Sequence, residues 1–194
     1  QPQFLVGDAG AGVKARFLAD GRVAFRARRA GTLRMLTVDH RGAVRAAAQA
    51  RLPAFEQNDR IYVRTANGIV SAASGDRFFA PVISPDGNRV AFEGLTTGIY
   101  VYDIAAASLT YVGIGTAPSW GADSKTLVYE RTEDDGHFVV ASDLWMWQAG
   151  GETRALTTTD ARIERRPALS PDGKKVAFDD DRGTVFVAPL EVTP

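Results

Sequence analysis

A ten-residue pattern occurs twice in this chain, almost letter for letter. Residues 83–92 read Ile-Ser-Pro-Asp-Gly-Asn-Arg-Val-Ala-Phe, and residues 169–178 read Leu-Ser-Pro-Asp-Gly-Lys-Lys-Val-Ala-Phe. Weaker copies lie at residues 17–25, 55–63 and 120–129. An internal repeat constrains a fold more than any local signal does, because each copy must build the same unit and the units must pack against one another.

Each copy predicts two β-strands joined by a tight turn. In Ser-Pro-Asp-Gly the proline presets φ for a turn, the aspartate accepts hydrogen bonds from backbone amides ahead of it, and the glycine accepts a positive φ. The Val-Ala-Phe that follows is typical of a returning strand. We therefore interpret the repeated turn as structural and not as a ligand site.

Each copy starts at an apolar residue, and these residues recur roughly every 40 positions, as the blades of a β-propeller do. They are Phe17, Phe55, Ile83, Trp120 and Leu169. In four copies a proline stands two residues earlier, which suits the beginning of an inner strand because no ladder hydrogen bond is lost there. These prolines are Pro53, Pro81, Pro118 and Pro167.

The sequence thus predicts an all-β fold, a single five-bladed β-propeller of antiparallel sheets. We expect the blades near residues 13–48, 52–77, 78–114, 115–157 and 163–190. The second blade is short, and we expect three strands or a stunted fourth. Residues 3–7 resemble the outer strand expected at residues 109–113, so we predict that they complete the last blade and close the ring, which removes exposed sheet edges.

The repeat resembles that of the TolB-type, WD-like propellers. The resemblance rests on Pro-x-(Trp/Leu/Ile)-Ser-Pro-Asp-Gly followed by Val-Ala-Phe, then Ile-Tyr-Val-Tyr-Asp at residues 99–103 or Leu-Trp-Met-Trp at residues 144–147, and Glu-Thr-Arg-Ala-Leu-Thr at residues 152–157. It covers essentially the whole chain. It implies a bacterial, periplasmic or otherwise exported propeller that binds an envelope protein.

We expect one face of the predicted ring to collect charged loops. The links before the inner strands and the turns between second and third strands both lie there, and a partner would be bound by bidentate arginine contacts to carboxylates. An insertion, residues 131–142, adds an aromatic and several acids. The alternative is ordinary solvated loop charge. The predicted partner-binding residues are Arg51, Arg77, Arg162, Arg165, Arg166, Asp134, Asp135, His137 and Phe138.

No cofactor, metal or catalytic residue is expected. Calcium is the alternative at Asp179–Asp181 or Glu133–Asp135, but neither run has the spacing of a calcium-binding loop. His40 and His137 lack zinc-ligand spacing, and the chain has no cysteine and no Gly-x-Ser-x-Gly motif. Trp120, Trp145 and Trp147 are read as packing between blades, with a sugar-binding surface as the alternative.

Charge and hydropathy restrict the partner further. Basic and acidic residues both number 23, so no net field favours nucleic acid, and no apolar run is long enough to span a bilayer. The sequence therefore favours a non-catalytic, monomeric scaffold propeller with a protein partner. A lectin-like or small-ligand-binding propeller is the second hypothesis, and a five-bladed hydrolase is the third.

Overall fold

The computed structural model describes the backbone of residues 16–17, 23–29, 32–39, 41, 43–46, 53–159 and 162–190, and the side chains of residues 36–39, 41, 43, 53–159 and 162–190. The chain divides into two compact units, Gln1–Leu52 and Pro53–Pro194. All regular structure in the described residues is β-strand, in five antiparallel sheets. The predicted all-β class with antiparallel sheets is confirmed.

The first unit contains sheet one, whose strands pair in chain order. Its strands are β1 (Arg16–Phe17), β2 (Val23–Arg29), β3 (Thr32–Val38) and β4 (Val44–Ala46). Leu36 and Val38 on β3 are buried. The turn before β4 is closed by the Asp39 carboxylate, which accepts the backbone N–H groups of Arg41 and Ala43 at 2.9 and 3.0 Å.

The second unit contains four sheets. Sheet two comprises β5 (Ala54–Gln57), β6 (Arg60–Thr65) and β7 (Gly68–Ser71). Sheet three comprises β8 (Phe78–Ile83), β9 (Arg89–Gly94), β10 (Gly98–Asp103) and β11 (Ser108–Gly113). Sheet four comprises β12 (Thr116–Trp120), β13 (Thr126–Asp134), β14 (Val139–Gln148) and β15 (Glu152–Ala155). Sheet five comprises β16 (Glu164–Leu169), β17 (Lys175–Asp180) and β18 (Val185–Pro189).

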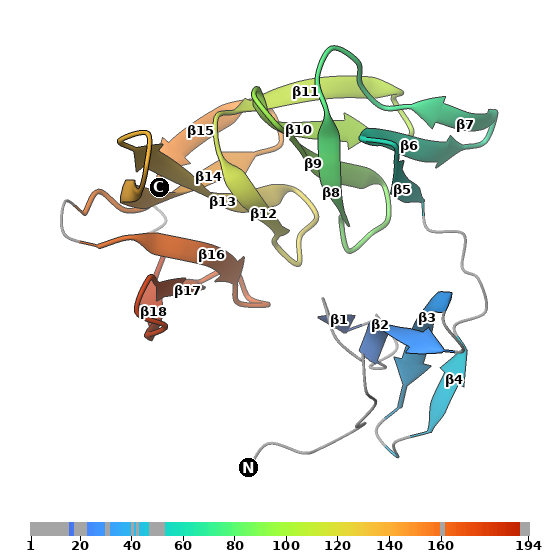
Figure 1. Cartoon of the computed structure of the whole chain (residues 1–194), viewed down its shortest axis with the longest axis horizontal. Helices are drawn as coiled ribbons and strands as arrows, with labels where there is room; N and C mark the ends of the chain where they lie inside the picture. Colours follow the sequence, from blue (N-terminus) through green and yellow to red (C-terminus); the bar gives the residue numbers. More distant parts are fainter. Residues whose placement is uncertain are drawn as a thin grey trace. The chain divides into compact units, whose positions relative to one another are not determined.

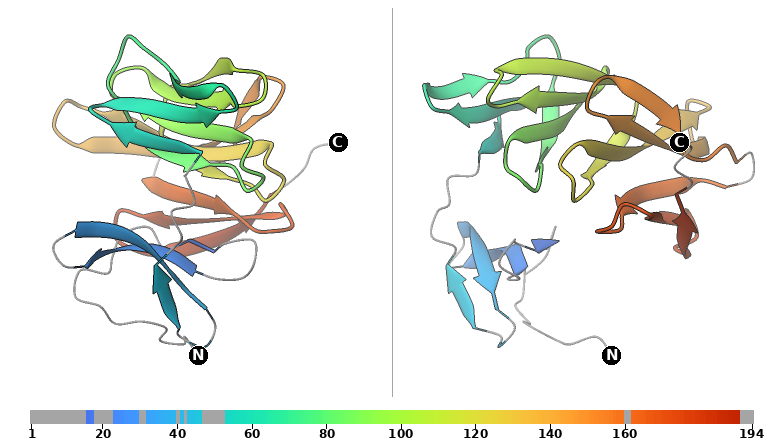
Figure 2. Two further views of the ribbon diagram at one scale, coloured as in Figure 1. Left: turned by 90° about the vertical axis from the view of Figure 1, so that its right-hand side faces the viewer. Right: turned by 180° about the vertical axis from the view of Figure 1, so that it is seen from behind.

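Within the second unit the sheets follow one another in a curved row. Figures 1 and 2 show that the first strands of sheets three and four, β8 and β12, lie on the inner side of this row, and that the last strands, β11 and β15, lie on its outer side. Sheets three and four therefore each present both faces to neighbouring sheets in the row, as propeller blades do.

The core lies between successive sheets, because alternate residues of one strand point to opposite faces. On β9 and β10, Phe92 and Tyr102 pack towards sheet two, while Ile99 and Val101 pack towards sheet four. A third cluster joins sheets four and five through Leu144, Val176 and Phe178. The strand β10 is therefore apolar on both of its faces.

The three tryptophans take part in this packing. Trp147 is buried, and Trp120 meets it edge to face with ring centroids 6.3 Å apart while donating its indole N–H to the carbonyl oxygen of Val82 at 3.0 Å. The Trp145 ring is covered by the guanidinium of Arg131 at 5.1 Å. All three tryptophans belong to the cluster between sheets three and four, which confirms the predicted packing between sheets.

The Ser-Pro-Asp-Gly segments form the expected turns. In sheet three the N–H of Gly87 donates to the carbonyl of Ser84 at 2.9 Å, and Asp86 accepts the N–H of Asn88 at 3.0 Å. Gly87 has φ of 77°, a conformation that glycine adopts without steric cost. Sheet four uses Ser124 at this position, with φ of 58°.

The predicted alignment of the second copy is wrong by one strand. Phe55 was expected to end an inner strand, but it lies on β5 in the position that Phe92 holds on β9. The Phe55 ring stacks on Tyr62 at 5.5 Å, as Phe92 stacks on Tyr100 at 5.8 Å. The described strands of sheet two therefore correspond to the second, third and fourth strands of sheet three.

Two predictions concern residues outside the described part of the chain. Residues 3–7, expected to complete the fifth sheet, and Arg51 both fall there. The number of blades and the closure of a ring therefore stay predictions. Val185 and Val187 on β18 are 71% and 64% exposed, whereas the matching residues of β10, Ile99 and Val101, are buried.

Candidate partner-binding face

In sheets three, four and five, one edge carries both the start of the first strand and the connection between the second and third strands. The pairs Phe78–Gly94, Thr116–Glu130 and Glu164–Asp180 place these segments side by side. We call the surface formed by these edges the loop face. It holds the described residues that the sequence predicted for partner binding.

Successive sheets are joined at the loop face by a repeated glutamate contact. In sheets three, four and five the residue before the inner-strand proline has a positive φ and lies in a bulge, where its N–H donates outside the ladder. A glutamate of the preceding sheet accepts that N–H instead. The three contacts are Ala80 to Glu56 at 3.4 Å, Ala117 to Glu93 at 3.2 Å and Arg166 to Glu130 at 2.6 Å.

These glutamates were missed by the sequence analysis, although a signal was present. They directly follow Ala54-Phe55, Ala91-Phe92 and Val128-Tyr129. Glu93 and Glu130 lie one residue beyond the end of their repeat copies, whereas Glu56 lies inside the second copy, which was aligned one strand too early. Because a buried or half-buried backbone N–H needs an acceptor, an acidic residue at a fixed place in each copy is typical of such a contact.

Arg77 and Asp76 join the turns of sheets two and three. The Arg77 guanidinium donates to Asp59 at 2.9 Å, and both side chains stay largely exposed. Asp76 accepts the backbone N–H of Thr96 at 2.9 Å and the hydroxyl of Thr97 at 2.7 Å. These hydrogen bonds lower the pKa of Asp76 from 3.8 to about 2.

Acid is expected to weaken the Asp76 contact. Because its pKa is lower in the folded protein, Asp76 contributes stability that is present above about pH 4 and is lost as the pH falls towards 2. The difference in thermal midpoint between the native chain and Asp76→Asn should therefore shrink over this range. Thermal unfolding followed by circular dichroism at each pH measures it. A difference that stays constant down to about pH 2 would contradict the assignment.

The remaining arginines of the loop face lie on sheet five. Arg166 donates through Nε to Asp179 at 3.0 Å and through Nη2 to the other carboxylate oxygen, and this hydrogen-bonded pairing raises its pKa. Arg162 lies over the Phe186 ring at 4.1 Å. Arg165 is half-buried, and its Nε has no hydrogen-bond partner in the described structure. The arginines thus have different surroundings, and only Arg166 is already bound to a carboxylate among these three.

The predicted insertion is a continuous β-hairpin and not a loop. Beyond the Glu130–Leu144 pair, β13 and β14 continue through Arg131–Asp143, Thr132–Ser142 and Glu133–Ala141, and a turn closes them. We call residues 131–143 the arm. The sequence analysis counted this segment among the charged loops because it is an insertion between the second and third strands of its blade.

The tip of the arm is exposed and acidic. Asp134 accepts the N–H of Gly136, and Asp135 accepts the N–H groups of His137 and Phe138, so both predicted acids build the turn. The Phe138 side chain is 75% exposed. The structure therefore brings Asp134, Asp135, His137 and Phe138 together at one point.

The foot of the arm is fixed to sheet five. The Ser142 hydroxyl donates to the carbonyl of Glu164 at 2.6 Å, and Ser142 forms a parallel bridge with Ile163. The buried Glu164 carboxylate accepts the hydroxyl groups of Thr157 and Thr159. The arm is therefore bound to sheet five at its foot, and at its acidic tip it exposes one aromatic side chain, Phe138.

The acidic run Asp179–Asp181, considered for calcium, is largely used by the protein itself. Asp179 binds Arg166, and Asp180 accepts the N–H groups of Arg182 and Thr184 at 3.0 and 2.8 Å. These contacts give the first two carboxylates structural roles.

Within the part of the chain whose structure is described, no helix is long and apolar enough to cross a membrane.

Comparison with known proteins finds similarity to TolB homologues. No family model matches the chain. The TolB homologues of Chlorobium luteolum and Chlorobium chlorochromatii are each 28% identical over 104 residues, which make up 50% of this chain and 22% of the relative. The chain thus matches only about a fifth of the length of these relatives.

Solved structures share the fold. A putative TolB from Agrobacterium tumefaciens has a TM-score of 0.54 at 16% identity, with 89% of this chain and 78% of that chain covered. Puromycin hydrolase has a TM-score of 0.59 at 15% identity, with 96% and 38% covered. The repeated turn and the row of antiparallel sheets thus give the chain the fold of the TolB-type β-propellers, and half of its sequence is similar to TolB homologues.

Proposed function

We propose that the chain is a non-catalytic binding module of the bacterial envelope that recognises a protein partner on its loop face. The match to TolB homologues supports this role and supports an exported localisation. The observation that carries the proposal is the arm, which holds an exposed phenylalanine at the end of a hairpin fixed at its foot.

The arm has the properties of a binding element. An aromatic side chain that is already ordered loses little conformational entropy on binding, and aromatic residues commonly contribute most of the affinity at protein interfaces. Glu133, Asp134 and Asp135 surround Phe138 with negative charge, which favours a partner surface that carries lysine or arginine around an apolar pocket. Arg162 and Arg165 provide positive charge on the neighbouring sheet.

Replacing Phe138 with serine is expected to weaken partner capture about tenfold or more without changing stability, because the side chain is 75% exposed. The tagged chain is immobilised and incubated with bacterial envelope extract, and the retained protein is quantified. Capture should also weaken with added salt.

Ile69→Ser is the matched control, because Ile69 is an exposed apolar residue, at 53%, on β7 and not on the arm. It should leave capture unchanged. Equal capture by the native chain and Phe138→Ser, or equal losses for both variants, would contradict recognition through the arm.

A further inference from the structure

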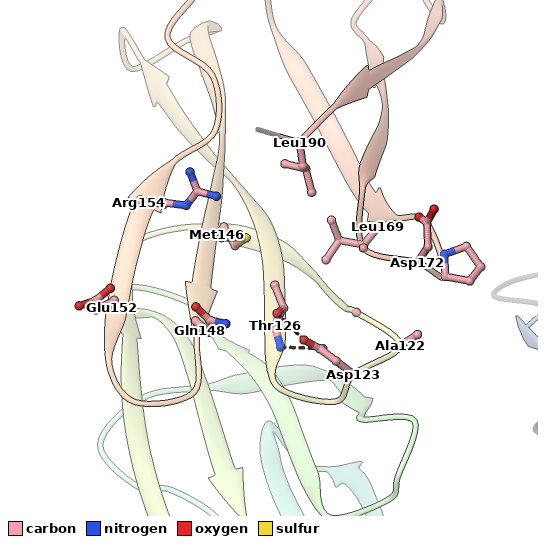
Figure 3. A pocket seen from close by; sticks show the side chains of 13 residues that line it. Ala122, Asp123, Thr126, Met146, Gln148, Glu152, Arg154, Leu169, Asp172 and Leu190 are labelled. Atoms are coloured by element: carbon pink, nitrogen blue, oxygen red, sulfur yellow. Dashed lines mark hydrogen bonds between the residues drawn. The ribbon is translucent and has the colours of Figure 1, made fainter. Parts of the chain in front are cut away.

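A cleft of about 460 Å³ lies between sheets four and five, at the ends of the sheets opposite the loop face. Met146 and Arg154 form one wall, and Leu169 and Leu190 form the other (Figure 3). The turn around Asp123 closes one end. This volume is within the range of about 300–1,000 Å³ that small-molecule sites occupy.

The cleft exists because three groups that seal the preceding gap are missing here. Between sheets three and four, Trp120 reaches the carbonyl of Val82, and Ser124 accepts the backbone N–H of Asp86 through its hydroxyl and a guanidinium N–H of Arg89 through its carbonyl. At the matching positions of the next gap the sequence has Leu169 for Trp120, Gly173 for Ser124 and Thr126 for Arg89. Each replacement is shorter, so the turns of sheets four and five are not bridged in this way.

The walls of the cleft combine an apolar surface with one positively charged side chain. The side chains of Met146, Leu169 and Leu190 give both walls an apolar surface, which we call the floor of the cleft. Arg154 is exposed on β15, and its guanidinium has no hydrogen bond or ion pair with any described residue. An apolar floor beside an unpaired cation is complementary to a molecule with an apolar body and one negative charge.

Carboxylates on the rim limit the charge of such a ligand. Asp123 accepts two N–H groups and the hydroxyl of Thr126, and Asp172 accepts the hydroxyl of Ser170 and the N–H of Lys174. Glu152 points away from the opposite wall in Figure 3. Because Asp123 and Asp172 place negative charge on the rim of the cleft, a dianion is disfavoured relative to a monoanion.

We propose that this cleft is a binding site for a small organic monocarboxylate, whose apolar body lies on Met146, Leu169 and Leu190 and whose carboxylate binds Arg154. This site is separate from the loop face, so it does not depend on the proposed protein partner. Octanoate is a suitable probe, with an expected dissociation constant of about 1 mM for a ligand of this size.

The two methionines of the chain, Met35 and Met146, allow a direct test. The full chain carrying ¹³C-methyl methionine is titrated with octanoate and followed by NMR. The Met146 signal should shift and saturate, while the Met35 signal stays in place. Inorganic phosphate and octylammonium should leave both signals unchanged. No shift of Met146, or an equal shift with octylammonium, would overturn the proposal.

Two variants test the walls separately. Arg154→Gln should weaken octanoate binding about tenfold, because it removes the cation without altering the floor. Leu169→Trp restores the residue that fills the preceding gap and should abolish binding while the second unit stays folded, which circular dichroism will report. Undiminished octanoate binding by both variants would show that the ligand lies elsewhere.

Discussion

Replacing Gly98 with alanine is expected to destabilise the second unit by about 3–5 kcal/mol. Gly98 begins β10 with φ of 100°, a conformation that side chains rarely adopt. A Cβ atom there would lie 2.4 Å from the carbonyl oxygen of Gly113 and 2.9 Å from the Cα atom of Ile114. Both contacts are with backbone, so no side chain can turn away, and the β10–β11 pairing must distort. Urea unfolding followed by circular dichroism measures the change in free energy.

Gly68→Ala separates the steric contact from the backbone conformation. Gly68 has φ of 121°, but nothing lies within 4 Å of the position that a Cβ atom would take. Its alanine variant should therefore lose only about 1–2 kcal/mol, from the unfavourable φ alone. Equal losses for the two variants would show that the close approach of β10 to Gly113 does not contribute.

The repeat made most of the fold predictable. A turn that needs proline, aspartate and glycine in a fixed order can be recognised from sequence, because each residue type satisfies a different backbone requirement. The strands that follow, such as Val90–Phe92, have a composition that fits a sheet packed on both faces. Local chemistry therefore indicates the strands and the turns, and the recurrence of the turns indicates several similar sheets.

The second copy shows where this reasoning fails. Phe55 follows a proline at the expected distance, but it is followed by Glu56, and Ile61–Val63 repeats the letters of Ile99–Val101. The spacing from Pro53 to Phe55 predicts an inner strand, whereas Glu56 and Ile61–Val63 indicate the second and third strands of a blade. The contact between Ala80 and Glu56 decides between these two alignments of the second copy. It could not be predicted from the sequence because it joins residues that are distant in the chain.

The candidate site was predictable in composition but not in arrangement. The sequence indicated charged residues at the loop face, but it could not show which of these side chains are bound within turns and ion pairs of the chain itself. Asp135 and Arg166 are used in this way, whereas Phe138 is left exposed. The arm was unpredictable for a related reason, because residues 131–135 have no alternation of polar and apolar residues and are paired through their backbone.

Glu164 connects the stability of sheet five with the position of the arm. It is 1% exposed and occupies the place on β16 that the buried Phe78 holds on β8. A buried carboxylate requires donors, and it finds them in Thr157 and Thr159 on the link that leads from sheet four. The same link is tied to β14, since the Thr157 hydroxyl accepts the N–H of Leu144 at 2.8 Å.

Glu164→Ala should therefore cost about 2–4 kcal/mol, because the two threonine hydroxyls lose their acceptor and a cavity remains. It should also speed hydrogen exchange of the amides of Ser142 and Leu144 at the foot of the arm, measured by mass spectrometry of the intact fold. Glu133→Ala, which removes an exposed carboxylate of the arm, should change stability by less than about 0.5 kcal/mol and leave this exchange unaltered. If Glu164→Ala loses stability but the foot of the arm exchanges as before, the link does not fix the arm. Partner recognition through Phe138 would then depend on the β13–β14 pairing alone.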